Sequence, residues 1–115
     1  INSAAVAGQI EGGAAMGLGY ALMEDVQIVN GVTLTPSFAE YLLPTASDIP
    51  ETKSIILESG TGLGPFGAKG IGEPSFTPVA PAIANAVANA IGARIYELPL
   101  TPERVLEAID KRQRE

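Results

Sequence analysis

Apolar and small residues fill the first part of the chain almost without a break. Residues 4–23 are apolar nearly all round, include five glycines, and have Gln9 and Glu11 as their polar interruptions. A segment that is apolar on every side predicts a helix enclosed by other elements. A membrane span is disfavoured, because a carboxylate and several glycines suit the bilayer poorly.

Small residues within this helix recur near i, i+4 spacing and predict a flat face for close contact. They are Gly8, Gly12 and Gly19, with Ala4 and Ala15. Two partners fit such a face. One is a tight helix–sheet crossing inside this domain, and the other is the remainder of a larger subunit with its cofactor.

The next part of the chain alternates between short apolar runs and turn residues. Residues 26–29 and 32–34 flank Asn30-Gly31, a dipeptide that suits a type I′ turn and predicts a β-hairpin. Residues 36–51 contain three prolines and predict an extended connector. Residues 53–58 (Lys-Ser-Ile-Ile-Leu-Glu) predict another strand, which leads into a glycine-rich loop.

Two helices are predicted in the last third of the chain, separated by a short strand. Residues 82–91 are alanine-rich, and Gly92 follows where a helix C-terminus favours glycine. Ser75 or Thr77 is the expected N-cap of this helix. Residues 94–98 predict a strand.

The final helix is expected to begin at Thr101 as N-cap, with Pro102 at its first position. Val105, Leu106 and Ile109 are expected to form its buried stripe, and residues 110–115 are expected to fray. The order of elements predicts a single α+β domain over residues 1–115. Its parts are a small, mostly antiparallel sheet, a glycine-rich N-terminal helix, a hairpin and two C-terminal helices.

Composition limits the chemistry. The 115 residues carry a net charge of −6 and contain no cysteine and no histidine. This excludes disulfides, iron–sulfur ligation and ordinary zinc sites, so no metal ligands are expected from the chain itself. The acidic balance argues against nucleic acid as a partner. No secretory signal pattern opens the sequence, and we expect a cytoplasmic protein without a membrane partner.

Glycine is densest immediately before Glu73. Six of the thirteen glycines lie between Gly60 and Gly72, a density that indicates positive φ or a close approach of the backbone to another body. Apolar residues flank the carboxylate in sequence, and apolar surroundings tend to raise a carboxyl pKa toward the range of a general base. They are Phe66, Ile71, Pro74 and Phe76. The alternative is a solvated surface loop with an ordinary glutamate.

Residues 62–67 (Gly-Leu-Gly-Pro-Phe-Gly) also fit the G-x-G-x-x-G pattern of dinucleotide-binding proteins. In that motif a helix starts at the second glycine, whereas here Pro65 and further glycines follow. No suitable βαβ unit surrounds the segment. We therefore discount a dinucleotide site.

Three blocks of the sequence together resemble one family, the molybdenum hydroxylases, which include xanthine dehydrogenase, aldehyde oxidoreductase and carbon monoxide dehydrogenase. The blocks are residues 8–13 (Gly-Gln-Ile-Glu-Gly-Gly), residues 69–74 (Lys-Gly-Ile-Gly-Glu-Pro) and residues 98–105 (Leu-Pro-Leu-Thr-Pro-Glu-Arg-Val). They occur in order and with suitable spacing along nearly the whole chain. The similarity is to the C-terminal portion of the molybdopterin-binding large subunit.

The resemblance implies hydroxylation of an aldehyde or a purine-like N-heterocycle by water at a molybdenum centre. It implies that the glutamate matching Glu73 is the general base, and that Gln9, Gly70, Ile71 and Gly72 lie against the molybdopterin cofactor. The metal is held by the pterin and not by protein side chains. The implied partners are the remainder of the large subunit, iron–sulfur and FAD subunits or domains, and a small-molecule substrate.

An alternative hypothesis is a non-catalytic fragment or assembly module that folds without the cofactor. In either case the chain alone is expected to bind no cofactor, to be inactive and to form homo-oligomers. The substrate and the mononucleotide or dinucleotide form of the cofactor are not indicated by these residues.

Overall fold

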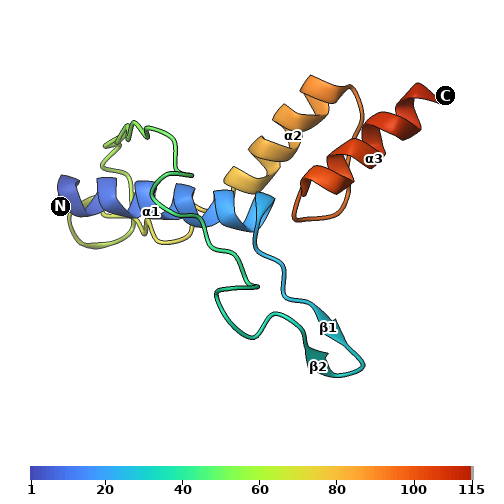
Figure 1. Cartoon of the computed structure of the whole chain (residues 1–115). Coiled ribbons are helices and arrows are strands. Elements are labelled where there is room, and N and C mark those ends of the chain that lie inside the picture. The colour runs from blue at the N-terminus through green and yellow to red at the C-terminus, as the bar shows by residue number, and fades with distance from the viewer. Residues whose placement is uncertain (115) are drawn as a thin grey trace.

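A computed structural model describes residues 1–114 of the chain. The elements follow the order α1 (Ser3–Leu22), β1 (Ile28–Val29), β2 (Val32–Thr33), a short 3-10 helix η1 (Pro65–Gly67), α2 (Val79–Ile91) and α3 (Pro102–Gln113). Figure 1 shows α1 crossing beside the start of α2, with the hairpin projecting away from the helices. The structure confirms a small α+β fold of helices with an antiparallel two-stranded sheet.

The N-terminal helix forms where the sequence predicts it, but it is not enclosed. The side chain of Asn2 caps α1 by accepting a hydrogen bond from the Ala5 amide at 3.0 Å. Its buried residues are Gly13, Gly17, Gly19 and Ala21; Gly13 and Gly17 face Ser75 and Val79, whereas Gly19 faces Pro44 and Glu24 on another side. Met16 and Tyr20 are exposed. The prediction of burial all round was wrong, because no element within residues 1–114 covers the other sides.

The hairpin confirms its turn prediction. Ile28 pairs with Thr33 and Val29 pairs with Val32, so that Asn30 and Gly31 form the two-residue connection. Both connecting residues have positive φ, 52° and 80°, as a type I′ turn requires. Every residue of the two strands is exposed, and the hairpin therefore stands out from the body as an apolar arm.

The two C-terminal helices also form, with small differences from their predicted ends. Pro78 precedes α2 without a side-chain cap, so neither Ser75 nor Thr77 is the N-cap. Gly92 ends α2 in the left-handed region, as predicted. Thr101 caps α3 by accepting from the Arg104 amide at 3.4 Å. The helix continues to Gln113, so residues 110–113 of the stretch expected to fray are helical, and Glu115 lies outside the described residues.

The buried stripe of α3 differs from the predicted one at a single position. Val105 and Ile109 are half-buried, whereas Leu106 is exposed. The far end of α3 is tied to α2, because the Arg112 guanidinium donates to the Ile91 carbonyl at 2.5 Å.

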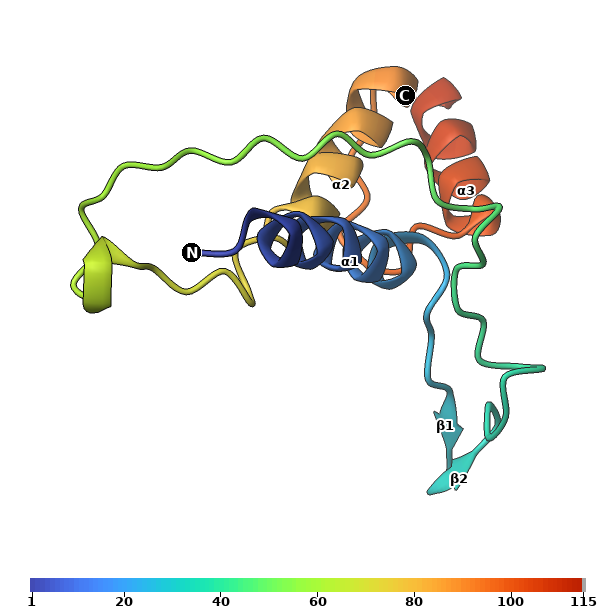
Figure 2. The same ribbon diagram turned by 90° about the vertical axis from the view of Figure 1, so that its left-hand side faces the viewer.

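A small apolar centre lies where α1 ends and α2 begins. Ala21, Ala80 and Leu100 are its buried apolar residues, and the Leu100 amide donates to the Ala21 carbonyl at 2.7 Å. The radius of gyration is 17.8 Å, whereas a compact domain of this size has a radius of about 13 Å. The chain is thus an open assembly of helices, arm and loops (Figures 1 and 2).

Two predicted strands are absent from the described residues. Residues 53–58 and residues 94–98 have no strand partner in the structure. The first of these runs as a stretched segment above α1 (Figure 2). A strand needs a hydrogen-bonded neighbour, and no other segment of residues 1–114 lies beside either one as a pairing strand.

Candidate functional site

The glycine-rich loop has two parts. Residues 60–68 form a turn that is held by its own hydrogen bonds, and residues 69–72 form an open segment. In the turn, the Gly62 amide donates to the Gly67 carbonyl and the Gly67 amide donates to the Gly64 carbonyl, both at 3.0 Å. A side chain at Gly64 would stand 2.8 Å from the Ala68 carbonyl oxygen. Gly60 and Gly67 have positive φ, which only glycine adopts without strain. These glycines serve the loop itself.

Gly70 and Gly72 belong to the open segment. At neither position does any atom from the rest of the described chain lie within 4 Å of where a Cβ would stand. Neither residue has a positive φ. Nothing within residues 1–114 therefore requires glycine there, and the backbone is free to meet another body.

Glu73 has a fixed backbone and a free carboxylate. Its carbonyl accepts from the Phe76 amide at 2.9 Å and from the Thr77 amide at 3.1 Å. The Thr77 hydroxyl donates to the same carbonyl at 3.2 Å. The side chain is exposed, and no hydrogen bond or ion pair involves its carboxylate within the part of the chain that the structure describes. These hydrogen bonds thus fix the main chain of Glu73, while its carboxylate oxygens have no hydrogen-bond partner among the described residues.

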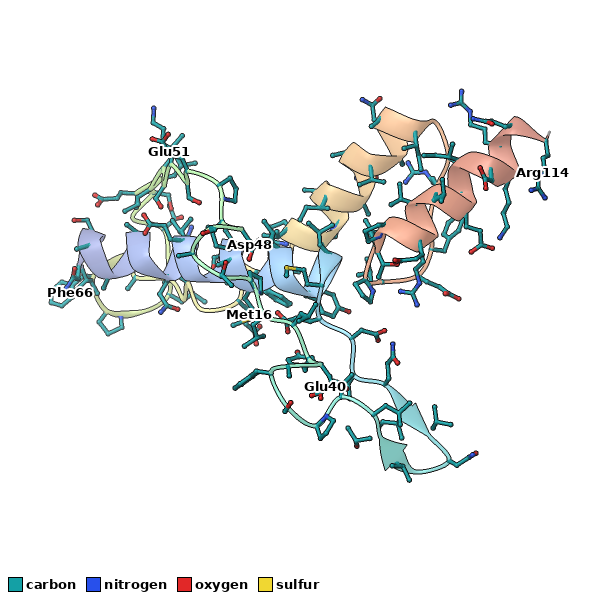
Figure 3. The ribbon with its side chains drawn as sticks, in the orientation of Figure 1. Met16, Glu40, Asp48, Glu51, Phe66 and Arg114 are labelled. Carbon is teal, nitrogen blue, oxygen red and sulfur yellow. The ribbon has the colours of Figure 1, made fainter. Side chains whose placement is uncertain are left out.

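The predicted apolar surroundings of Glu73 are not formed by Phe66. That side chain is 98% exposed and lies at the end of the molecule far from α3 (Figure 3). Phe66 also has φ 57°, an uncommon value for a bulky residue. Pro74 is exposed, and Ile71 and Phe76 are half-buried. The apolar residues that flank Glu73 in sequence thus leave its side chain exposed within residues 1–114.

Glycines form the side of α1 that contacts the residues immediately after Glu73. A side chain at Gly13 would stand 2.6 Å from Cβ of Ser75, and one at Gly17 would stand 2.5 Å from Cβ of Val79. The rings of Tyr20 and Phe76 meet edge to face with centroids 5.8 Å apart. Of the glycines that sequence reasoning chose for close contact, Gly8 and Gly12 stand in open space, whereas a side chain at Gly19 would stand 2.8 Å from Pro44. The i, i+4 signal was present at Gly13 and Gly17 as well.

Gln9 lies one helical turn before Gly13 and therefore on about the same side of α1. Its side chain is exposed and makes no hydrogen bond among the residues described. The glycine contact brings this side of α1 against Ser75, two residues beyond Glu73. No atom from the rest of the described chain, Gln9 included, lies within 4 Å of a Cβ at Gly70 or Gly72, so a shared contact of Gln9 and the open segment with a cofactor stays a prediction.

The perturbed ionisable groups lie elsewhere. The hydrogen bond from Tyr41 to Glu24, at 2.5 Å, raises the pKa of Tyr41. The Thr45 hydroxyl, followed by the Thr45 amide, lowers the pKa of Asp48. Neither pair is part of the Glu73 turn.

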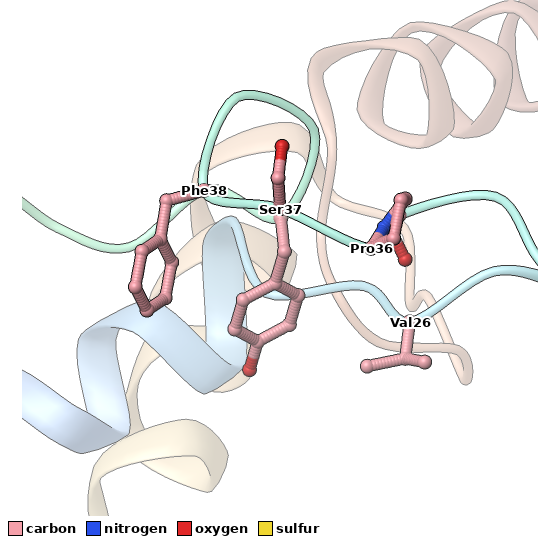
Figure 4. Close-up of a pocket in the computed structure, with 6 residues that line it drawn as sticks. Val26, Pro36, Ser37 and Phe38 are labelled. Atoms are coloured by element: carbon pink, nitrogen blue, oxygen red, sulfur yellow. The ribbon is translucent and has the colours of Figure 1, made fainter.

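An open hollow of about 400 Å³ lies at the base of the hairpin. It is lined by Val26, Thr35, Pro36, Ser37, Phe38 and Tyr41 (Figure 4). Tyr41 is the titratable residue of this lining, and its hydroxyl is already hydrogen-bonded to Glu24. No group of His, Cys, Asp and Glu residues within residues 1–114 has the arrangement of a metal site. None of the described helices is long and apolar enough to cross a membrane.

Comparison with known proteins places this geometry in context. Residues 1–50 match the molybdopterin cofactor-binding domain family. The chain is 41% identical over 109 residues to the xanthine dehydrogenase molybdenum-binding subunit of Escherichia coli, covering 93% of this chain and 14% of that protein. It is 43% identical over 110 residues to an aldehyde oxidoreductase from Megalodesulfovibrio gigas, covering 94% of this chain and 12% of that protein.

The fold has a counterpart among solved structures. The crystal structure of quinoline 2-oxidoreductase from Pseudomonas putida 86 superposes with a TM-score of 0.89 at 35% identity, covering 96% of this chain and 15% of that one. The chain thus spans about one seventh of the length of the curated relatives it matches.

Proposed function

Because this chain belongs with the molybdenum-binding subunits of the molybdenum hydroxylase family, of which it spans a part, we propose that it forms one wall of a molybdopterin site and supplies the general base. The observation that carries this proposal is the free carboxylate of Glu73, which follows two glycines that the described chain leaves open. A base must be able to reach the proton it abstracts, and these glycines let another body approach.

The residues present fit a cofactor that brings its own metal ligands. Gly70 and Gly72 leave space where side chains would otherwise stand. The side chain of Gln9 in α1 is exposed and makes no hydrogen bond among the described residues. We infer that the pterin lies along Gln9 and the backbone of residues 70–72. When bound, the cofactor supplies the redox centre and the site at which an oxygen atom from water reaches the substrate.

Glu73 is the residue to which we assign proton transfer. Its carbonyl is anchored by Phe76 and Thr77, so the side chain starts from a defined point. In the proposed enzyme the Glu73 carboxylate would accept the proton of the attacking oxygen, because it is exposed and makes no hydrogen bond among the described residues. Enclosure by the remainder of the subunit, which this chain lacks, would exclude water from the site and strengthen that interaction.

The proposed substrate class rests on the names of the relatives. Their names refer to xanthine, to aldehydes and to quinoline, so we propose an aldehyde or an N-heterocycle. The proposed partners are the remainder of the subunit and separate iron–sulfur and FAD parts, in a cytoplasmic enzyme. Several relatives are themselves named as subunits.

A second candidate is a non-catalytic fragment, and the open shape of the chain favours it for residues 1–115 in isolation. A binding pocket needs convergent walls, whereas the Glu73 side chain is exposed in the described residues. The two candidates differ in scale: the first concerns the whole subunit and the second concerns this part alone.

Replacing Glu73 by Gln in the full-length subunit tests the proposal. The amide keeps the size of the side chain but cannot accept the proton, so turnover should fall by about 10²–10⁴-fold, the usual contribution of a general base. Molybdenum content should stay near that of the parent, because the carboxylate is not a metal ligand.

Glu11→Gln is the matched control. The Glu11 carboxylate is exposed and accepts only a long hydrogen bond from Ser54, at 3.5 Å, so its loss should change turnover little. A Glu73→Gln enzyme that is fully loaded with molybdenum and turns over within about threefold of the parent would exclude Glu73 as a base of the usual strength.

A further inference from the structure

We propose that residues 53–58 are a β-strand whose sheet is completed by another segment of the molybdenum-binding subunit, outside this chain. The inference rests on the proposed function only in that the chain is part of a larger subunit. It concerns an interaction surface and makes no use of Glu73.

The sequence of this segment is that of a strand covered on both faces. Three consecutive aliphatic residues, Ile55, Ile56 and Leu57, occupy its centre. Side chains alternate between the two faces of a strand, so Ile55 and Leu57 point one way and Ile56 points the other. Strands with apolar residues on both faces are typical of sheets buried on both sides.

The structure leaves this segment without a main-chain partner. Residues 49–61 take part in no backbone–backbone hydrogen bond, whereas the helices, the hairpin and several turns of the described chain pair theirs. The segment runs extended past α1 (Figure 2). Its amides and carbonyls are therefore available along both edges.

The aliphatic side chains of this segment are exposed as well. Ile55 is 71% exposed and Leu57 is 88% exposed, while Ile56 is 36% exposed. Two polar contacts hold the neighbourhood of the segment: Ser54 donates to Glu11 at 3.5 Å, and Lys69 donates to Ser59 at 2.8 Å. These contacts fix the path of the chain on one side and cover none of the aliphatic residues.

An extended segment with free edges and exposed aliphatic side chains is suited to β-augmentation, in which a strand joins a sheet from another part of a structure. The occupant to which we commit is a strand of the remaining subunit. This chain spans 14% of a relative's length, so most of a subunit lies outside it. The same fold recurs within the longer quinoline enzyme with a TM-score of 0.89, which shows that this open path is one that a larger chain adopts.

Hydrogen–deuterium exchange on the cofactor-loaded, full-length subunit tests this strand. Peptides that span residues 53–58 should exchange at least about tenfold more slowly there than in a dilute solution of residues 1–115, because paired amides open only with their sheet. Peptides that span the hairpin tip at Asn30-Gly31 serve as an internal comparison, since their exchange reports the local dynamics of a turn.

Two results would overturn the inference. One is exchange of residues 53–58 in the full-length subunit as fast as in the dilute chain. The other is slow exchange that appears only when either protein is concentrated, which would identify a second copy as the partner. Residues 53–58 could self-pair antiparallel, with Lys53 opposite Glu58, so the concentration series is required.

The readout also separates this inference from the proposed function. Protection of residues 53–58 together with full activity of Glu73→Gln would reject the assigned base and keep the strand. Loss of activity in Glu73→Gln without protection of residues 53–58 would keep the assigned base and reject the strand.

Discussion

At the scale of single residues, the glycines fall into groups with different physical reasons. Some have positive φ, some face a neighbour too close for a side chain, and some have neither reason within the described chain. The last group consists of Gly8, Gly12, Gly70 and Gly72. Glycine costs stability inside a helix, so its presence at an open position points to a body outside this chain. The proposed cofactor contacts lie in this group or next to it.

Two adjacent glycines of α1 give a matched test of this distinction. In residues 1–115, Gly13→Ala should lower the thermal unfolding midpoint, because the new Cβ would stand 2.6 Å from Cβ of Ser75 and 2.9 Å from its carbonyl carbon. Gly12→Ala enters open space and should stabilise the helix by about 0.8–1.0 kcal/mol, the difference in helix propensity. Circular dichroism measures both changes.

The same pair of variants in the full-length subunit shows what lies beyond the chain. If Gly12→Ala stabilises residues 1–115 but destabilises the subunit, another segment or the cofactor occupies the space beside it. Equal stabilities for Gly12→Ala and Gly13→Ala in residues 1–115 would show that the contact with Ser75 does not form.

At the scale of elements, the structure separates local signals from long-range ones. The Asn30-Gly31 turn, the Thr101 cap with Pro102 and the Gly92 stop were all predicted from a few neighbouring residues, and all form. Residues 53–58 also have a strand pattern, but a strand needs a partner that residues 1–114 do not contain. The expected burial of α1 failed for the same reason. Sequence reasoning selected Glu73, whose side chain is exposed in the structure, and its role as a general base stays a prediction.

The start of α3 contributes a pH-dependent stability. The backbone amide of Glu103, followed by the Thr101 hydroxyl, holds the pKa of Glu103 below its ordinary value. A lowered folded-state pKa adds stability that is present above the unfolded value, about 4.3, and is lost as the pH falls through the folded value. Acidification below about pH 4 should therefore reduce helicity.

Glu103→Gln isolates this contribution. Its helix should be less stable than the parent at neutral pH, and its circular dichroism should change less on acidification. Some acid dependence should persist, because Lys111 lowers the pKa of Glu107 through a 2.7 Å ion pair. Identical acid titrations of the variant and the parent would show that the carboxylate of Glu103 does not support the helix start.

At the scale of the whole molecule, little of the chain is covered. Its extents are 55 × 37 × 27 Å, and three apolar residues form its buried centre among the residues described. The hairpin arm exposes aliphatic side chains on both faces, including Ile28, Val29 and Val32. Exposed apolar area of this kind promotes association, and in the proposed enzyme the remainder of the subunit would cover it.

Residues 1–115 alone should therefore form dimers or larger oligomers and should retain no molybdenum. Sedimentation velocity over a concentration series measures the first property, and elemental analysis of the purified chain measures the second. Replacing Val29 and Val32 on one face of the arm by Thr should reduce association while keeping strand propensity. A compact monomer at high concentration, or stoichiometric molybdenum, would contradict this account of an incomplete wall.

The contact between α1 and α2 has a consequence for chain topology. The segment between these helices, residues 23–78, is a closed loop that carries the arm, the extended strand segment and the glycine turn. The entropy of closing a flexible loop grows only with the logarithm of its length, by about 0.6 kcal/mol for each doubling. Residues added or removed at Asn30-Gly31 therefore alter the pairing of the two helices very little. A single insertion between Gly72 and Ser75 has the opposite effect, because it displaces Ser75 from the glycine face against which it rests. Length variation is thus tolerated at the tip of the arm and excluded beside the carboxylate.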